Sequence, residues 1–548
     1  MKTILIIFIY FISVSSSIAD QNSSRLDPLF KELTQIKNEL AADLILAEIW
    51  SIWSKTDNEI AQEIFEEGNQ LMNKGQFEES ILTFTEVIAL QPDFAEAYSN
   101  LGSVLNHLGK LEDAELFTRK AIELNPNFAN AYCNLGNVLR DLGKLQDAEL
   151  SYRKAIEIKP DYAEAHYNLG NVFRDLGKYQ EAELSYRKAI ELNPNYSKAY
   201  YSLSLLKYSD KNKIWQDQLF SKNILKNNSR KDQIDIYFAR ANILHKEENY
   251  KESSRYLRLA NNLKLAMNPS TYKTHRLIKN TETLLFESNQ ENINKKEIKN
   301  SSESIFIVGM PRCGSTLVES IISIKNNVCD LGEINILGES FQEYKKSKED
   351  LNLAELYWEK VNKITELNIT TNKWLYNYQY AGIIARQIPN AKIIYCYRNP
   401  LDNILSIYRA HFAQGNEYSS SIVDCTNVYL NQEKVMREYK NRFKSKIYEL
   451  NYDKLVRNPN KEIKSLISWL SWKWDDSYLK PHLNQRAVST RSNVEIRSPI
   501  NSKSVDGWKN YKDMLKPAIE ILSQTERYLH LLSSVSYTHL TLPTNREV

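Results

Sequence analysis

A 34-residue period runs through residues 61–196 and constrains the fold more than any other feature of the sequence. Three near-identical units begin with Ala95-Glu-Ala-Tyr-Ser-Asn-Leu-Gly102, Ala129-Asn-Ala-Tyr-Cys-Asn-Leu-Gly136 and Ala163-Glu-Ala-His-Tyr-Asn-Leu-Gly170. Each unit continues to a Leu-Gly-Lys turn, a second helical stretch and a proline that ends it. Units of this length bury their apolar faces only against their neighbours, so the period predicts an α-solenoid.

The units resemble tetratricopeptide repeats, which are pairs of antiparallel helices. A looser first unit covers 61–94, and degenerate units follow at about 197–230 and 233–267, so the solenoid is expected to span 61–286. Two roles stay open for it: a scaffold or homodimer surface, and a concave face that binds an acceptor polypeptide or partner protein. Asparagines recur on the first helices, where an amide can grip a peptide backbone or equally bridge repeats. They are Asn100, Asn134, Asn137, Asn168 and Asn171.

Charge and cysteine content exclude several classes of protein. The 71 Lys and Arg residues nearly balance 68 Asp and Glu, so the chain lacks the basic excess of a nucleic-acid binder and no nucleic-acid partner is expected. Five dispersed cysteines, without a CxxC pair or a His at metal-ligand spacing, predict buried thiols in place of a disulfide framework or a metal site. A chain of 548 residues has room for two or three domains.

The two ends of the chain differ in character from its middle. Residues 1–19 combine Lys2, an apolar run and small residues in the order of a signal peptide. A cleaved signal, a short anchor and a mis-called start stay open, and the location is secretory or membrane-associated in the first two cases and cytoplasmic in the third. Residues 20–60 are expected to form a helical segment over the first repeat, and 533–548 resemble a non-native tail of translated adapter sequence.

An α/β pattern follows a polar stretch at 287–303, which is rich in Asn, Lys and Ser and predicts a linker. Short apolar strands then alternate with helical patterns over 304–532. The expected strands are 304–309, 327–330, 391–397 and 448–451, and the expected helices are 316–324, 351–365, 401–410 and 459–471. This alternation predicts a parallel sheet that holds ligands at the carboxyl ends of its strands.

The segment Ile305-Phe-Ile-Val-Gly-Met-Pro-Arg-Cys-Gly-Ser-Thr316 has the order of a phosphate loop: an apolar strand, a tight turn and a helix start. The spacing Gly309-x4-Gly314 matches a Walker A motif, but Ser315 stands where that motif needs Lys. Arg312 is the cation inside the loop instead. The pattern therefore indicates a site for a phosphate whose nucleotide carries an activated group other than a triphosphate.

Two blocks in this half carry a family resemblance. Pro311-Arg-Cys-Gly-Ser-Thr316 resembles the 5′-phosphosulfate loop of sulfotransferases that use 3′-phosphoadenosine 5′-phosphosulfate (PAPS). The block from Ile393 to Ser406 resembles their 3′-phosphate motif, in which Arg398 ends a strand and a serine follows eight residues later on a helix. The blocks resemble in particular the tyrosylprotein sulfotransferases and microbial tetratricopeptide-linked enzymes. The resemblance covers about 304–511 and implies a P-loop-like sulfotransferase fold with PAPS as co-substrate.

The resemblance also implies three catalytic residues. Glu333 aligns with a Gly-Glu carboxylate that takes the acceptor's proton, which separates this chain from cytosolic small-molecule sulfotransferases that use His. Lys373 neutralises the bridging oxygen as it leaves, and Arg312 braces the sulfonate. The alternatives for Glu333 and Lys373 are a capping or surface carboxylate and a snorkelling surface lysine. His411 is a rival base but is interpreted as structural.

The implied donor-binding set is larger. It comprises Arg312, Cys313, Gly314, Ser315, Thr316, Arg398, Ser406, Tyr452 and Ser504. Cys313 is interpreted as a small filling side chain and not as a nucleophile. A core position is an equal alternative for Tyr452. In the late loop that closes over the cofactor, Ser504 is preferred, with Asp506 and Lys509 as alternatives.

These observations predict a PAPS-dependent sulfotransferase whose repeats present the acceptor, with protein tyrosine preferred and a carbohydrate or small hydroxylated metabolite second. Two other classes are weighed against it. A P-loop kinase or NTPase is disfavoured by the missing Walker lysine. A repeat adaptor with a vestigial nucleotide domain is disfavoured by the intact set of charged residues.

Overall fold

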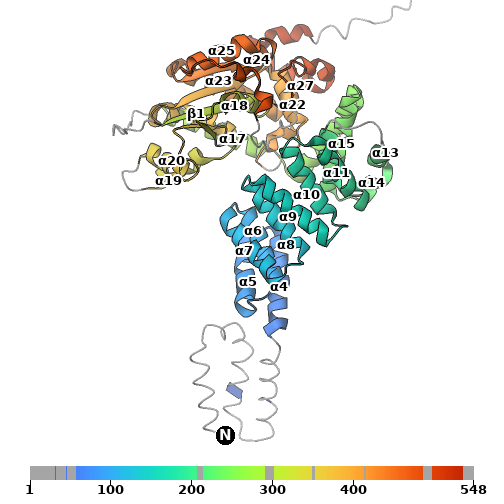
Figure 1. The fold of residues 1–548 in the computed structure, drawn as a ribbon. Helices are drawn as coiled ribbons and strands as arrows, with labels where there is room; N and C mark the ends of the chain where they lie inside the picture. Colours follow the sequence, from blue (N-terminus) through green and yellow to red (C-terminus); the bar gives the residue numbers. More distant parts are fainter. Residues whose placement is uncertain are drawn as a thin grey trace, which may run out of the picture. The chain divides into compact units, whose positions relative to one another are not determined.

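The computed structural model describes residues 57–206, 214–289, 302–347, 352–412, 415–484 and 496–534, together with residues 31, 32 and 45 (Figure 1). The expected signal at 1–19 lies outside the described residues, as do most of the expected N-terminal helical segment, linker and tail. The chain forms two compact units, an N-terminal unit that ends at Asn168 and a C-terminal unit that begins at Leu169. No helix of the described ranges is long and apolar enough to cross a membrane.

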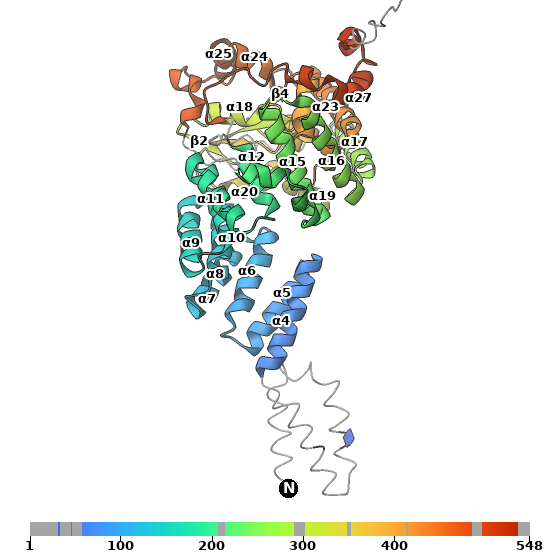
Figure 2. The same cartoon turned by 90° about the vertical axis from the view of Figure 1, so that its right-hand side faces the viewer.

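The N-terminal unit consists of successive helix pairs, which Figure 2 shows from the side. Its helices are α4 (Asp57–Lys74), α5 (Phe77–Leu90), α6 (Ala95–His107), α7 (Leu111–Leu124), α8 (Ala129–Asp141), α9 (Leu145–Ile158) and the start of α10 (Ala163–Asp175). Glycine lets the helices of one pair approach closely, because a Cβ at Gly136 would lie only 2.6 Å from the buried ring of Tyr152. The predicted solenoid is confirmed.

Amides of the recurrent asparagines join neighbouring repeats within this unit. Asn100, Asn134 and Asn168 each donate a hydrogen bond to a side chain of the preceding repeat. The acceptors are Asn69 Oδ1 at 2.7 Å, Ser99 Oγ at 3.0 Å and Cys133 Sγ at 3.7 Å. Of the two uses that the sequence leaves open for these three side chains, the structure shows the bridging one.

The C-terminal unit begins with the remaining repeats. Their helices are the rest of α10, α11 (Tyr179–Leu192), α12 (Ser197–Leu205), α13 (Ile214–Phe220), α14 (Lys222–Lys226), α15 (Arg230–Lys246), α16 (Tyr250–Met267) and α17 (Thr271–Glu287). The expected degenerate unit at 233–267 is the antiparallel pair α15–α16, which we call the repeat hairpin. The expected unit at 197–230 is less regular, with one short helix and two shorter ones after it.

A five-stranded parallel sheet follows, with strand order β2-β3-β1-β4-β5. The strands are β1 (Glu303–Gly309), β2 (Val328–Asp330), β3 (Ile369–Asn372), β4 (Lys392–Tyr397) and β5 (Ile447–Asn451). The helices are α18 (Ser315–Ile322), α19 (Ile336–Lys346), α20 (Leu353–Asn362), α21 (Ala381–Gln387), α22 (Pro400–Tyr408), α23 (Ile422–Arg442), α24 (Tyr452–Arg457), α25 (Pro459–Trp469) and α27 (Lys512–Leu522), with 3-10 turns that include η1 (Leu375–Tyr380) and η5 (Gly507–Tyr511). The predicted α/β domain with a parallel sheet is confirmed.

One strand and several helices were not expected from the sequence. Strand β3 is only four residues long, and its Thr-Thr-Asn end lacks an apolar run, yet Thr370, Thr371 and Asn372 are fully buried. Side-chain hydrogen bonds compensate for that burial, since Asn372 Nδ2 donates to Ile334 O at 3.0 Å and Thr370 Oγ1 to Ser304 Oγ at 3.3 Å. Helices α19, α21, α23 and α24 were also missed.

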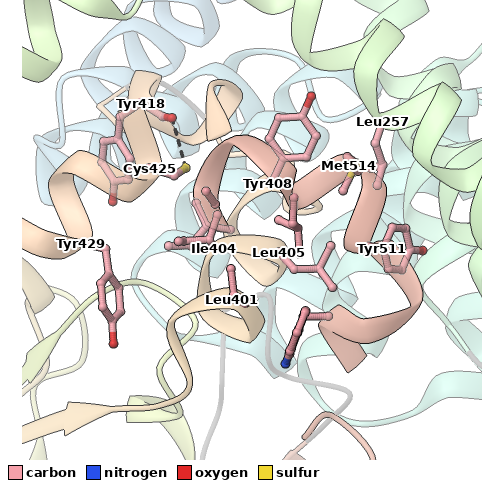
Figure 3. Packing of buried hydrophobic residues seen from close by; sticks show 14 of the residues in the cluster. Leu257, Leu401, Ile404, Leu405, Tyr408, Tyr418, Cys425, Tyr429, Tyr511 and Met514 are labelled. Atoms are coloured by element: carbon pink, nitrogen blue, oxygen red, sulfur yellow. Dashed lines mark hydrogen bonds between the residues drawn. The ribbon is translucent and has the colours of Figure 1, made fainter. Parts of the chain in front are cut away.

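Three apolar clusters hold the C-terminal unit together. Alternate residues of β1 point to opposite faces of the sheet, with Phe306 in one cluster and Ile307 in another. The third cluster joins the repeat hairpin to α22, α23 and α27, and Figure 3 shows Leu257 of α16 beside Met514 and Tyr511. One core therefore includes residues from both sides of the 287–303 segment.

Candidate active site

The carboxyl end of every strand in the sheet leads to a residue that the sequence singled out. Strand β1 leads to Arg312, β2 to Glu333, β3 to Lys373, β4 to Arg398 and β5 to Tyr452. Because all five strands are parallel, these ends share one edge of the sheet. The edge is where an open α/β sheet binds its ligands.

The loop between β1 and α18 needs glycine at two positions. A Cβ at Gly309 would lie 2.3 Å from the carbonyl oxygen of Cys396 on β4. Gly314 has φ 97° and a Cβ there would lie 2.2 Å from the ring of Tyr452. Gly314 is the N-cap of α18, and no side chain caps that helix. The loop therefore brings the N-terminus of α18, with Ser315 and Thr316 in its first turn, to the site edge.

The two anion motifs touch each other. Arg312 Nε donates to Ser406 Oγ at 3.1 Å, although 94 residues separate them. Arg398 Nη1 donates to the Arg312 carbonyl at 3.4 Å. Asn403 Nδ2 of α22 donates to the Pro311 carbonyl at 2.9 Å, which fixes the loop against the start of that helix. The structure thus brings Arg312, Arg398 and Ser406 into one cluster.

Arg398 lies at the centre of this cluster and is only 6% exposed. Its guanidinium lies 4.8 Å above the ring of Tyr452 and donates from Nη2 to the Ser504 carbonyl at 2.6 Å. The Tyr452 hydroxyl and Ser504 Oγ are 3.0 Å apart. Arg398 Nε makes no hydrogen bond among the described residues and lies 3.9 Å from Asp453 Oδ1, while Nη2 lies 3.9 Å from Asp402 Oδ2. A guanidinium suits an anion such as a phosphate.

The loop that contains Ser504 and Asp506 is hydrogen-bonded to α22 through a carboxylate that the sequence did not single out. Asp402 accepts hydrogen bonds from the backbone N–H groups of Asp506 at 2.8 Å and Trp508 at 2.9 Å. Burial raises the pKa of Asp402, against the opposing effect of nearby Arg398. Asp506 itself pairs with Arg457 at 3.0 Å and with Lys509 at 3.4 Å. Of the late-loop candidates, the structure therefore brings Ser504 to Arg398.

A second cluster lies at the ends of β2 and β3. Lys373 Nζ is 2.6 Å from Glu333 Oε1 and 3.7 Å from Glu319 Oε2. Lys373 and Glu319 are 1% and 2% exposed, whereas the Glu333 side chain is 49% exposed. The ammonium is therefore a buried charge held between two carboxylates, and only the Glu333 carboxylate also reaches solvent. This placement differs from the alternative of a surface lysine.

His411 and Cys313 lie outside these two clusters. His411 pairs through Nε2 with Asp235 at 2.9 Å and stacks on Phe238, so its contacts are with the repeat hairpin. Cys313 is 1% exposed and belongs to the same apolar cluster as Ile307. All five cysteines are free thiols, and four of them are buried as predicted, whereas Cys329 is partly exposed. In the described parts of the chain, no three His, Cys, Asp or Glu residues are grouped to hold a metal ion.

Sequence reasoning missed Glu319 and Asp402, which both face the candidate residues. The available signal was a charged residue within an apolar helix pattern: Glu319 interrupts Leu-Val-Glu-Ser-Ile-Ile, and Asp402 interrupts Pro-Leu-Asp-Asn-Ile-Leu. Carboxylates are rarely buried unless they are paired or hydrogen-bonded. The sequence therefore allowed the inference that Glu319 and Asp402 are buried and paired. It did not show which residues they pair with.

Comparison with known proteins agrees with this architecture. Residues 339–476 match a family model described as "Sulfotransferase family", a range that includes Lys373, Arg398 and Tyr452 but begins after Glu333. Residues 68–109 and 136–174 match a "TPR repeat" model. Further matches to "Tetratricopeptide repeat" models cover 95–128, 163–196 and 117–149. The chain carries a sulfotransferase domain together with tetratricopeptide repeats.

Individual relatives are more distant. A 306-residue stretch of the chain is 28% identical to an uncharacterized protein of Aquifex aeolicus (strain VF5). This match covers 52% of the present chain and 40% of that relative. The chain thus spans less than half the length of this curated relative. Among solved structures, the chain is similar to MamA (25% identity, TM-score 0.24) over 34% of this chain and 96% of MamA. It is also similar to PilF of Pseudomonas aeruginosa (16% identity, TM-score 0.32) over 40% of this chain and 96% of PilF.

Proposed function

We propose that this chain transfers the sulfuryl group of PAPS to a hydroxyl acceptor, with protein tyrosine as the preferred acceptor. The observation that carries the proposal is the convergence of four charged residues and Tyr452, one from each strand end, on one edge of one sheet. The matched sulfotransferase model supports the reaction class. The preference for tyrosine rests on the motif resemblance alone, with carbohydrate and small hydroxylated acceptors as the alternatives.

The donor side of the site offers separate cations for the two ends of the nucleotide. The first turn of α18 and Arg312 suit the 5′-phosphosulfate, because helix N–H groups and a guanidinium both stabilise negative charge. Arg398 and Ser406 suit the 3′-phosphate, because a guanidinium and a hydroxyl both donate hydrogen bonds to phosphate oxygens. The contact between Arg312 and Ser406 would keep the two subsites at a fixed spacing.

The acceptor side would use the Lys373–Glu333 pair. Glu333 would accept the proton of the acceptor hydroxyl while that oxygen forms a bond to sulfur and the bond from sulfur to the 5′-phosphate oxygen breaks. Lys373 would stabilise the negative charge left on the phosphate oxygen. In the structure the Lys373 ammonium and the Glu333 carboxylate form an ion pair at 2.6 Å. The buried Glu319 carboxylate, at 3.7 Å, would remain as a counter-charge for the ammonium when Glu333 contacts a substrate.

Two measurements test the proposal. Titration with adenosine 3′,5′-bisphosphate and with ATP should show a clear preference for the bisphosphate, and equal affinities would overturn the PAPS assignment. Glu333→Gln should lower sulfate transfer about 100-fold or more at an unchanged bisphosphate Kd. Glu339→Gln is the matched control, since Glu339 is an exposed carboxylate on the neighbouring helix α19. Equal turnover in both variants would show that another residue is the base.

A labelled-PAPS assay then identifies the acceptor class. Tyrosine peptides, glycans and small phenols are offered at equal concentration to the full chain. Transfer to the tyrosine peptides above the other two supports the preferred acceptor. Transfer to glycans instead would replace tyrosine with carbohydrate while leaving the donor assignment in place.

A further inference from the structure

The repeat hairpin contacts both elements that form the Arg398 side of the candidate site. Those elements are helix α22, which carries Asp402 and Ser406, and the segment 504–511, which lies against Arg398. Figure 3 shows their shared core, in which Leu257 of the hairpin lies with Leu405 of α22 and with Tyr511. The contacts include specific hydrogen bonds as well as apolar packing.

The first contact is made by Tyr511, the last residue of η5. Its hydroxyl is 2.7 Å from His245 Nδ1 of α15 and 3.0 Å from Ser253 Oγ of α16. Ser253 Oγ also donates to the Ala241 carbonyl at 2.8 Å. Since each hydroxyl has one proton, all three bonds form together only in one direction: His245 donates to Tyr511, Tyr511 to Ser253, and Ser253 to the carbonyl.

This chain of hydrogen bonds anchors the end of a short segment. Three and five residues before Tyr511, the N–H groups of Trp508 and Asp506 donate to Asp402. At the start of the segment, the Ser504 carbonyl accepts from Arg398 Nη2 at 2.6 Å. The segment is therefore held at one end by the site arginine and at the other by the hairpin.

The second contact is at the carboxyl end of α22. The last turn of a helix leaves carbonyl groups without partners in the helix. Asn261 Nδ2 of α16 donates to the Tyr408 carbonyl at 3.0 Å, and Lys264 Nζ donates to the Phe412 carbonyl at 3.0 Å. His411 pairs with Asp235 of α15 at 2.9 Å. Side chains of the hairpin thus fix the end of the helix whose start adjoins Arg398.

We propose that the repeat hairpin is part of the donor-binding machinery, with Tyr511 as a positioning residue that acts through the segment 504–511 on Arg398. The inference rests on the proposed function, because it assumes that Arg398 and Ser406 hold the 3′-phosphate of the donor. It adds a role for the last repeat that differs from both scaffold and acceptor binding: the hairpin sets the geometry of the nucleotide site.

Tyr511→Phe tests this role in the full-length chain. The variant keeps the ring, which packs against Tyr250 at 5.5 Å and under Arg409 at 5.8 Å, and removes only the hydroxyl. We expect the Kd for adenosine 3′,5′-bisphosphate and the KM for PAPS to rise about tenfold, with kcat at saturating donor changed less than about twofold. Tyr439→Phe is the matched control, because it removes a buried hydroxyl that donates to the Gln379 carbonyl at 2.9 Å.

A pair of substitutions at His245 separates positioning from general destabilisation. In His245→Asn the amide nitrogen stands as many bonds from Cβ as Nδ1 does and can donate to Tyr511, whereas His245→Leu offers no donor. Bisphosphate affinity should be close to wild type in the Asn variant and reduced about tenfold in the Leu variant. Equal affinity in both, or equal losses in Tyr511→Phe and Tyr439→Phe, would overturn the inference.

Hydrogen exchange on the wild-type chain gives a second readout. If the hairpin supports the donor site, bisphosphate must in turn protect the hairpin, because coupling between two sites is reciprocal. Amides of α15 and α16 should exchange more slowly when the ligand is bound, while those of α7 should not change. No protection of α15 and α16 overturns the inference. A wild-type chain that does not bind bisphosphate at all would instead overturn the proposed function.

Discussion

The first helix of a regular repeat and the first helix of the last repeat pair differ in how their buried residues are arranged. In α8 of the N-terminal unit, the buried residues Ala129, Ala131, Cys133, Leu135, Gly136, Val138 and Leu139 are interrupted by more exposed ones. In α15, the residues Ile234, Ile236 and every position from Phe238 to Leu244 are buried. A helix with an interrupted pattern keeps a more exposed side, whereas a helix that is buried on all sides lies inside a core.

The difference shows what divergence from the repeat pattern means in this chain. The regular units share small residues and asparagines at the contacts within and between helix pairs. The repeat hairpin contacts α22, α23 and α27, so its sequence is fitted to those surfaces. Loss of the repeat signature at 233–267 therefore marks an interface and not a decaying repeat.

Truncation at two positions should give the largest contrast. A chain that begins at Ala163 keeps α10 to α17, and we expect it to fold and to bind bisphosphate with an affinity within about threefold of the full chain. A chain that begins at Thr271 lacks the hairpin and leaves the third apolar cluster open, so we expect aggregation or loss of cooperative unfolding. Circular dichroism, solubility and calorimetric titration measure both. If the chain that begins at Thr271 still bound bisphosphate, the repeat hairpin would not differ from the regular repeats in its importance for the donor site.

Gly136→Val should have the next largest effect, confined to the regular repeats. A Cβ at this position meets the Tyr152 ring at 2.6 Å, so the substitution should reduce the free energy of unfolding of the N-terminal unit by about 3 kcal/mol. Leu150→Val on α9 is the control, because Leu150 is 66% exposed and its change should cost little. Urea unfolding followed by hydrogen exchange at 57–168 measures the loss. An accompanying change in bisphosphate affinity would contradict the assignment of donor binding to the other region.

Acid should weaken the hairpin by a smaller amount. Burial, together with the neighbouring charges of Arg409 and Lys246, lowers the pKa of His245 from 6.5 to about 3. The unfolded chain then binds a proton between these values that the folded chain does not, so this stability is present above pH 6.5 and lost as the pH falls. Between pH 7 and 5 the wild type should lose about 2 kcal/mol more than His245→Asn in chemical unfolding. Equal losses in the two proteins would show that folding does not lower the pKa of His245.

The sequence predicted the features that depend on local patterns. The 34-residue period, the apolar runs of β1 and β4 and the glycine spacing of the phosphate loop are each visible within a short window. The contact of Arg312 with Ser406 followed from the two motifs only as an expectation of nearness, because the strand order that makes β1 and β4 neighbours was not predicted.

Features that depend on contacts between residues far apart in the chain could not be predicted from the sequence. Strand β3 is short and polar, and its place between β2 and β1 is what brings Lys373 to Glu319 and Glu333. The bond of Tyr511 to His245 spans 266 residues, and neither side chain lies in a recognisable motif. The roles of the candidate residues stay predictions.

The span between His245 and Tyr511 also affects the order of events during synthesis. Each regular repeat packs against repeats that are close to it in the sequence. His245 of the hairpin, in contrast, pairs with Tyr511, which is synthesised 266 residues later. At roughly 5–20 residues per second, this delay is on the order of 10–50 s. During that time α15 and α16 lack the apolar partners that Tyr511 and α27 supply, so part of their apolar surface stays exposed on the nascent chain.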